Sequence, residues 1–313
     1  MKRLTGALVA ALLFAIPAKA ADPIKMVVPF AAGGPVDALA RIVAQELTAR
    51  LATDVVVENR GGAGGLLAVE QVARAPADGR TILFASVGAF VITNALKPQP
   101  GYDQLKTFAP VARIGAAPTL FIVKADSPFR TLPELIAKAK TDKMSYGSAG
   151  AGTTMHIVAE QLNKSAGTKI THVPYRGIAP ALNDIMGGHI DFLNGDITVL
   201  YPLVKQGTLR ALAVCGTERT SLLPDLPTAA ELGYKDVYME NWYGALVPAA
   251  TPPEVVAKLE AAIMDAVKTP EVWAKISANG VYAPQDAKTF RAQIEKDIGY
   301  WAPEIKKLGI QAE

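Results

Sequence analysis

MVVPFAAGGPVDALAR, at residues 26–41, is the stretch that decides the fold of this chain. An apolar strand runs into a loop of small residues, and Pro35 then begins an amphipathic helix. Proline suits the first helical position, and glycine lets the backbone amides of the loop face outward. These amides and the positive end of the helix dipole meet at one point, which favours an anion. Because the loop contains no Lys, His, Cys or Ser, we expect it to bind an anion without attacking it.

The N-terminal part of the chain alternates between strand and helix patterns. We predict strands at 24–28, 54–58 and 81–86, with helices at 35–51 and 66–74 between them. This βαβαβ order predicts a parallel sheet with helices on both faces. Ligands of such sheets bind beyond the carboxyl ends of the strands, where we expect loops at 29–34, 59–65 and 86–90.

A second unit of the same kind begins near residue 123 and carries a loop rich in glycine and hydroxyl groups at 148–154. An apolar stretch at 238–247 then returns to the first unit. Helices near 251–268, where Thr251 and Glu254 form a helix-start signal, 271–278 and 287–308 are expected to pack around that unit. The pattern predicts an α/β fold of two lobes with a ligand cleft and two crossings, which suits closure on a ligand. The expected division is a signal peptide at 1–20, lobe 1 at 21–122 plus 245–313, and lobe 2 at 123–244.

The first twenty residues have the pattern of a secretory signal. Basic Lys2 and Arg3 precede a short apolar run, and Ala18-Lys19-Ala20 is a small-x-small cleavage site. We therefore expect an exported chain. Cleavage would change 32 basic and 29 acidic residues into 29 of each. With no basic stripe and no interleaved aromatics, nucleic acid is not an expected partner.

The second lobe offers two near-matches to catalytic or nucleotide-binding motifs. Gly147 and Gly152 have P-loop spacing, but Thr153 stands where lysine is required, so nucleoside triphosphate binding is not expected. Ser148 lies in Y-G-S-A-G, where Tyr146 replaces the first glycine of a nucleophile elbow. A plain turn with a helix cap is the structural alternative.

Other polar residues were considered as possible metal ligands or ligand-binding groups. The histidines lack metal-ligand spacing, and no cysteine or carboxylate cluster completes a site, so neither a metal nor a cofactor is expected. Cys215 is expected to be a buried small hydrophobe. Arg176 is a candidate clamp for a ligand carboxylate, with a solvated loop arginine as the alternative. Asp196 either binds an amine or hydroxyl of a ligand or caps the next helix.

Several of these segments occur in an order that resembles one family. PFAAGGPVD at 29–37, VENRGGAGG at 57–65, DG at 78–79, YGS at 146–148, HVPYRG at 172–177 and TPPE at 251–254 follow one another along the chain. Together they resemble the periplasmic receptors of tripartite tricarboxylate transporters, also called Bug receptors, over essentially the whole mature chain. The resemblance implies a type II periplasmic-binding-protein fold. It also implies binding of a small carboxylate: a di- or tricarboxylate, an acidic amino acid or an aromatic carboxylate.

The resemblance also implies which residues form the site. The first loop would hold one ligand carboxylate with main-chain amides, and the second lobe would close over the ligand. The implied ligand-binding residues are Phe30, Ala31, Ala32, Gly33, Gly34, Ser86, Ser148, Ala149, Gly152, Thr153, Thr154, Tyr175, Arg176, Gly177 and Asp196.

We therefore expect a monomeric periplasmic receptor that serves the membrane permease subunits of such a transporter and is not an enzyme. One rival is a signalling receptor that presents its ligand to a membrane sensor kinase. Another is a hydrolase that uses Ser148 with His156. The incomplete elbow and the missing triad carboxylate disfavour the hydrolase.

Overall fold

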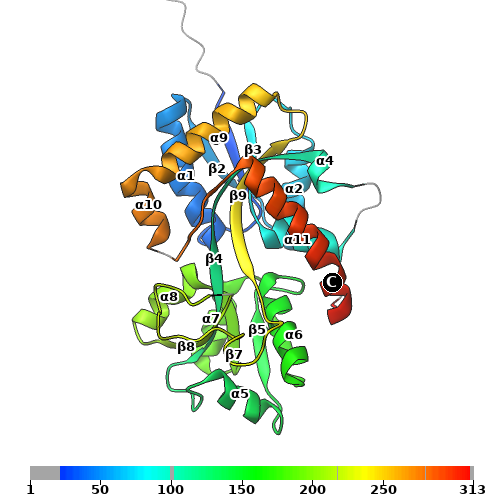
Figure 1. The fold of residues 1–313 in the computed structure, drawn as a ribbon, viewed down its shortest axis with the longest axis vertical. Coiled ribbons are helices and arrows are strands. Elements are labelled where there is room, and N and C mark those ends of the chain that lie inside the picture. The colour runs from blue at the N-terminus through cyan, green and yellow to red at the C-terminus, as the bar shows by residue number, and fades with distance from the viewer. Residues whose placement is uncertain (1–21, 99–101, 217, 279, 311–313) are drawn as a thin grey trace, which may run out of the picture.

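The computed structural model describes residues 22–98, 102–216, 218–278 and 280–310, which form two α/β lobes (Figure 1). The signal peptide predicted at 1–20 lies outside the described residues. Within the described ranges, no helix has the length and apolar character needed to cross a membrane.

The sheet of lobe 1 begins with three parallel strands in the order β2, β1, β3. Their bounds are Val55–Asn59, Ile24–Val28 and Thr81–Ser86. Antiparallel β9 (Glu240–Pro248) follows β3, and β4 (Phe108–Lys124) follows β9. The short strand β10 (Gln285–Asp286) also pairs with β4. The βαβαβ unit predicted from the sequence is therefore confirmed.

Lobe 2 has a second sheet, in which β7, β5 and β6 are parallel. Their bounds are Phe192–Asp196, Ser145–Ser148 and Thr171–Pro174. The second half of β4 lies antiparallel to β7 on one side and to β8 (Leu209–Cys215) on the other. The carboxyl ends of β5 and β6 carry the two loops that the sequence assigned to the ligand.

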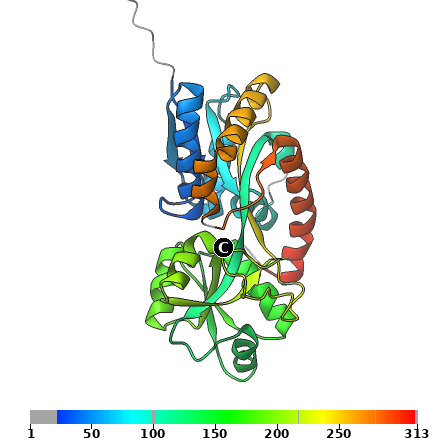
Figure 2. The ribbon, with the colours of Figure 1, turned by 60° about the vertical axis from the view of Figure 1, so that its left-hand side comes forward.

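Two strands connect the lobes. β4 is 17 residues long; it pairs with β9 as far as Pro118 and with β7 and β8 from Thr119 onward. At about 3.3 Å per residue, such a strand is long enough to run through both lobes. β9 is the return crossing, and Figures 1 and 2 show both strands running from one lobe into the other. The predicted two-lobe α/β fold with two crossings is confirmed, and the lobe limits stay a prediction.

Helices cover both faces of each sheet (Figure 2). On one face lie α1 (Pro35–Leu51), α9 (Pro253–Lys268) and α10 (Pro270–Ser277) in lobe 1, with α7 (Ile178–Gly187) and α8 (Ile197–Lys205) in lobe 2. On the other lie α2 (Leu66–Ala73), η2 (Gly88–Ile92), α3 (Thr93–Leu96), α4 (Gln104–Thr107), α5 (Leu132–Ala139), α6 (Thr154–Ala166) and α11 (Ala287–Leu308). The 3-10 turn η1 (Ala63–Gly65) precedes α2.

Two hydrophobic cores, one on each side of the joined sheets, extend through both lobes. Along β4, Phe121 and Val123 belong to one core, and Leu120 and Ile122 belong to the other. Successive side chains of a strand point to opposite faces, so a crossing strand contributes to both cores. Cys215, at the end of β8, is buried as predicted.

Two local predictions were wrong, and a third was incomplete. The segment 86–90 is not a loop, because η2 begins at Gly88 and buries all of its residues. Thr251 does not cap α9: the helix starts at Pro253, so Pro252 occupies the capping position and the Thr251 hydroxyl has no partner among the described residues. α11 packs against α6 of lobe 2 as well as against lobe 1.

Candidate functional site

The loop at 30–34 lies at the carboxyl end of β1 and leads into α1. Ala31 and Ala32 are exposed, and Gly33 has a φ of 87°, in the left-handed region that favours glycine. Within the described residues, the amides of Ala31, Ala32 and Gly34 have no hydrogen-bond acceptor. These N–H groups and the first turn of α1 are therefore available to an anion.

Asp37, in the first turn of α1, holds this loop through hydrogen bonds. It is not among the site residues that the sequence analysis named. Its buried carboxylate accepts hydrogen bonds from Gly33 N at 2.9 Å, Asn59 Nδ2 at 2.9 Å and Arg41 Nε at 3.1 Å. Asn59 Nδ2 also donates to Phe30 O at 3.1 Å, so both ends of the loop are held. Burial alone would raise the pKa of Asp37, but these hydrogen bonds outweigh it and lower the pKa. An acid in the first turn of a helix is the sequence signal that could have identified it.

The neighbouring loop at 61–65 packs against the start of η2. Thr93 Oγ1 lies 2.8 Å from Gly64 O and 3.0 Å from Gly88 O, so its one proton can serve either carbonyl. A Cβ added to Gly61 would lie 3.5 Å from Ala31 N. The carboxyl ends of β1, β2 and β3 therefore gather three segments into one surface, as the parallel order predicted.

In lobe 2, the loop at 148–154 lies beside the segment 175–177. Tyr175 N donates to Ser148 O at 3.0 Å, and Gly177 N donates to Ala149 O at 3.2 Å. These backbone bonds continue the pairing of β5 with β6 beyond the strand ends. The two predicted contact segments of lobe 2 therefore form one continuous edge.

The amides of the loop at 148–154 divide into two sets. Gly150 N donates to Ser148 Oγ at 3.1 Å, and Gly152 N donates to His156 Nδ1 at 3.0 Å, so these amides serve the loop itself. In the described part of the chain, the amides without an acceptor include those of Ala149, Ala151 and Thr154. Thr153 Oγ1 donates to Gly150 O at 2.7 Å. The amide donors that lobe 2 can offer to an anion are therefore those of the second set.

The two lobes meet at this loop. A Cβ added to Gly152 would lie 2.4 Å from Leu96 Cδ1 in α3. A Cβ added to Gly88 would lie 3.2 Å from Thr154 Cγ2 and 3.7 Å from Ser86 Oγ. The structure therefore brings Ser86 of lobe 1 close to the second loop, although the two segments are far apart in sequence.

Tyr175 and Arg176 differ in how much they can offer to a ligand. The Tyr175 hydroxyl donates to Asp184 Oδ2 at 2.5 Å. Burial, and to a smaller extent this hydrogen bond, raise the pKa of Tyr175 to about 12. Arg176 is exposed and has no partner among the described residues. The guanidinium charge of Arg176 is therefore free for a ligand, whereas the Tyr175 hydroxyl is already engaged.

Asp196 caps α8, as one of its two sequence interpretations predicted. Its Oδ1 accepts from Thr198 N at 2.9 Å, and its Oδ2 accepts from Asn241 Nδ2 at 2.9 Å and from the Tyr243 hydroxyl. Burial and the adjacent carboxylate raise the pKa of Tyr243, so its hydroxyl stays protonated and donates. The Oδ1 atom of Asp196 therefore caps α8, and its Oδ2 atom ties lobe 2 to the crossing strand β9.

The pairing of Ser148 with His156, assumed for a hydrolase, is wrong. Ser148 is fully buried, and its Oγ lies 2.6 Å from His172 Nε2, while His156 bonds to the Gly152 amide. Among the described residues, no carboxylate is bonded to His172. A buried hydroxyl without an oriented base lacks the geometry of a catalytic triad.

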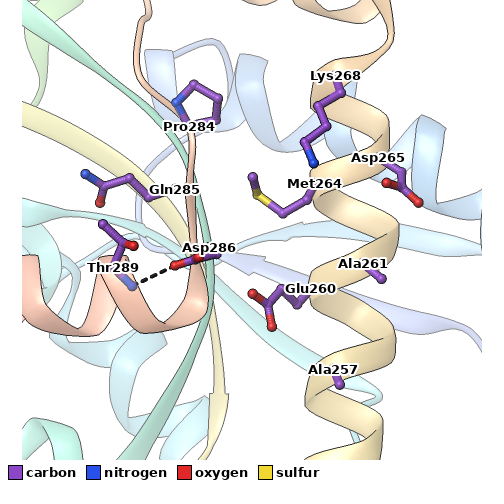
Figure 3. A pocket seen from close by; sticks show the side chains of 10 residues that line it. All are labelled: Ala257, Glu260, Ala261, Met264, Asp265, Lys268, Pro284, Gln285, Asp286 and Thr289. Atoms are coloured by element: carbon purple, nitrogen blue, oxygen red, sulfur yellow. Dashed lines mark hydrogen bonds between the residues drawn. The ribbon is translucent and has the colours of Figure 1, made fainter.

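An open pocket of about 560 Å³ lies away from these loops, between α9 and the segment 284–289 (Figure 3). Glu260, Asp265 and Asp286 lie around it, with Lys268 at one end. Glu260 and Asp286 already accept backbone amides at the start of α11. The excess of carboxylates disfavours an anion in this pocket. Neither here nor in the rest of the described ranges does a group of three or more His, Cys, Asp or Glu side chains have an arrangement that could hold a metal ion.

Comparison with known proteins gives one consistent result. Residues 39–310 match the family model described as "Tripartite tricarboxylate transporter family receptor". A Pseudomonas sp. (strain P51) protein from the tcbD-tcbE intergenic region is 36% identical over 277 residues, which are 88% of this chain and 82% of that protein. Protein BugT of Bordetella pertussis is 31% identical over 296 residues, or 92% of this chain and 90% of BugT.

Solved structures agree in fold over nearly the whole chain. The periplasmic binding protein BugD superposes with a TM-score of 0.84 at 34% identity and covers 93% of this chain and 99% of its own. MatC of Rhodopseudomonas palustris, solved with bound malate, gives 0.83 at 30% identity over 90% of this chain and 98% of its own. A second R. palustris protein, solved with adipate, superposes with a TM-score of 0.86 at 30% identity. The match covers 92% of this chain and 98% of that protein.

Proposed function

Because this chain belongs to the tripartite tricarboxylate transporter receptor family, we propose that it is a periplasmic receptor for a small carboxylate, which it binds between its lobes. We propose further that it delivers this ligand to the membrane permease subunits of such a transporter. Family membership supports the assignment to solute receptors. The ligand class, the location and the transport partner are the proposed part.

One observation supports the carboxylate proposal: each lobe contributes a loop with free main-chain amides, and the loop of lobe 2 packs against lobe 1. A hydrogen bond between neutral donors and a ligand contributes about 1 kcal/mol, so several together can approach the roughly −8 kcal/mol of micromolar affinity. Arg176 adds an unpaired cation that suits a second carboxylate. The complexes of two neighbours with malate and with adipate, both dicarboxylates, support the same ligand class.

A thermal-shift screen tests the proposal. The chain without residues 1–20 would be unfolded and refolded to remove carried ligand, then heated with mono-, di- and tricarboxylates and with their amides. A ligand at about a hundred times its Kd stabilises the native state by roughly 2.7 kcal/mol, so a true ligand should raise the Tm in a concentration-dependent way. We expect at least one dicarboxylate to do so and its diamide not to. A rise with neutral solutes or amines and with no carboxylate would refute the proposal.

A further inference from the structure

Three aromatic rings cluster beside the loop at 148–154 of lobe 2. The ring centroids of His156 and His172 are 3.9 Å apart, with their planes at 11°. Tyr146 lies beside His172 on the neighbouring strand, with centroids 5.0 Å apart and planes at 20°, and its ring is 6.5 Å from that of His156. The rings come from α6, β6 and β5, so the fold places two imidazoles face to face.

Both imidazoles are bonded to the loop above them. His172 Nε2 lies 2.6 Å from Ser148 Oγ at the start of the loop. His156 Nδ1 accepts the Gly152 amide at 3.0 Å near its end. A ring nitrogen that accepts a hydrogen bond carries no proton, so the bond to Gly152 requires a neutral His156.

The surroundings favour the neutral form of the pair. Burial first, and then a charge on His156, lower the pKa of His172 to about 4. The Tyr146 hydroxyl donates to Glu160 Oε1 at 2.6 Å, which directs this carboxylate to the tyrosine. Phe192 of β7 adds an apolar ring against Tyr146. Other titratable groups on the elements that carry or pack against the pair include Tyr146 on β5, Glu160 and Lys164 on α6, and Asp297, Tyr300, Glu304, Lys306 and Lys307 on α11.

We propose that the neutral His156–His172 pair is a positioning element that holds the loop at 148–154 in its binding shape, and that protonation of His156 releases the loop. A proton on Nδ1 would turn the acceptor of the Gly152 amide into a donor, and the two N–H groups would then repel each other. This inference rests on the proposed carboxylate function, because the released loop is the one that would hold the ligand.

The release would weaken binding through geometry. Gly152 is also where lobe 2 packs against Leu96 of lobe 1, so loss of its hydrogen bond loosens the contact that closes the two lobes. An imidazolium that touched the ligand directly would have the opposite effect, because it would attract a carboxylate. The direction of the pH dependence therefore separates a positioning role from a direct contact.

Backbone NMR on the ligand-free chain tests the bond itself. With ¹⁵N-glycine labelling, we expect the Gly152 amide resonance to shift as the pH falls from about 7.5 to about 4.5. In His156→Asn, the asparagine Oδ1 takes the place of Nδ1 and accepts the same bond without titrating, so we expect this shift to disappear. In His189→Asn, a control at an exposed turn residue, the shift should persist. No titration of Gly152 in the wild type, or the same titration in His156→Asn, would overturn the inference.

Calorimetry with malate and adipate tests the consequence. On acidification from about pH 7.5 to about pH 5, we expect the affinity of the wild type to fall about tenfold more than that of His156→Asn, the loss of about one hydrogen bond. The variant corrects for protonation of the ligand itself. Equal losses in the two proteins, or tighter binding at low pH in the wild type alone, would overturn the positioning role. If neither acid binds at any pH, the proposed ligand class fails, and the NMR experiment still decides the inference.

Discussion

Substitution of Gly152 by alanine probes the contact between the lobes. Gly152 has a φ of 73°, so alanine there costs about 1 kcal/mol of folding stability. The new Cβ would also lie 2.4 Å from Leu96 Cδ1, well inside the usual carbon–carbon distance of about 3.5–4.0 Å. Either Leu96 leaves its rotamer, at a cost of about 0.5–1.5 kcal/mol, or the lobes close less completely. We therefore expect ligand affinity to fall by about two- to tenfold.

Gly167→Ala is the matched control for this experiment. Gly167 ends α6 with a φ of 64°, and a Cβ there would meet nothing within 4 Å. Both variants should lose about the same stability in urea unfolding, and only Gly152→Ala should lose affinity for malate or adipate in calorimetry. The double variant Gly152→Ala/Leu96→Ala should regain most of the ligand affinity that Gly152→Ala loses. Equal affinities of the two single variants, or no recovery in the double variant, would refute the contact as part of binding.

Three further predictions concern the loops and the imidazoles. Asn59→Ala removes the amide that bridges Phe30 O and Asp37, so calorimetry should show carboxylate affinity weakened by about 1 kcal/mol; unchanged affinity would contradict this. Arg176→Ala should weaken the binding free energy of adipate by roughly 1–3 kcal/mol more than that of the monoamide of adipate. Equal losses for the two ligands would show that Arg176 does not bind the second carboxylate. The pKa of His172 is lowered from 6.5 to about 4, so its contribution to stability is present above pH 6.5 and is lost as the pH falls to 4. Because the ring is only about half buried, we expect the free energy of unfolding in urea to fall by roughly 1–2 kcal/mol over this pH range. His172→Gln should not show this fall. Identical pH profiles of stability in the two proteins would contradict the prediction.

Local signals predicted the elements that begin and end with a specific residue type. The expected bounds of α1 and α11 match the structure, because Pro35 stands at the first position of α1 and Asp286 and Gly309 cap α11. Thr131 and Glu134 form a capping box at the start of α5, a local pattern of the same kind. η2 was missed because its apolar residues carry neither a helix cap nor a helical period.

The contacts that shape the site could not be read from local patterns. Asp37 meets Asn59 across 22 positions of sequence, and Asp196 meets Tyr243 across 47. The partner of Ser148 was misassigned because His156 lies closer in sequence, whereas His172 lies on the neighbouring strand β6. Such pairs depend on strand order and register, which local patterns leave open.

Calorimetry on Gly34→Val tests the central claim, that free amides of two facing loops hold a carboxylate. Gly34 has an ordinary φ of −84°, and a Cβ there would meet only Ala31 O at 3.8 Å, so the variant should fold as the wild type does. Its side chain would stand over the free amides of the first loop. We predict that the refolded wild type binds malate or adipate at one site and that Gly34→Val, with the same Tm, shows no measurable binding. Wild-type affinity in the folded variant would contradict the account.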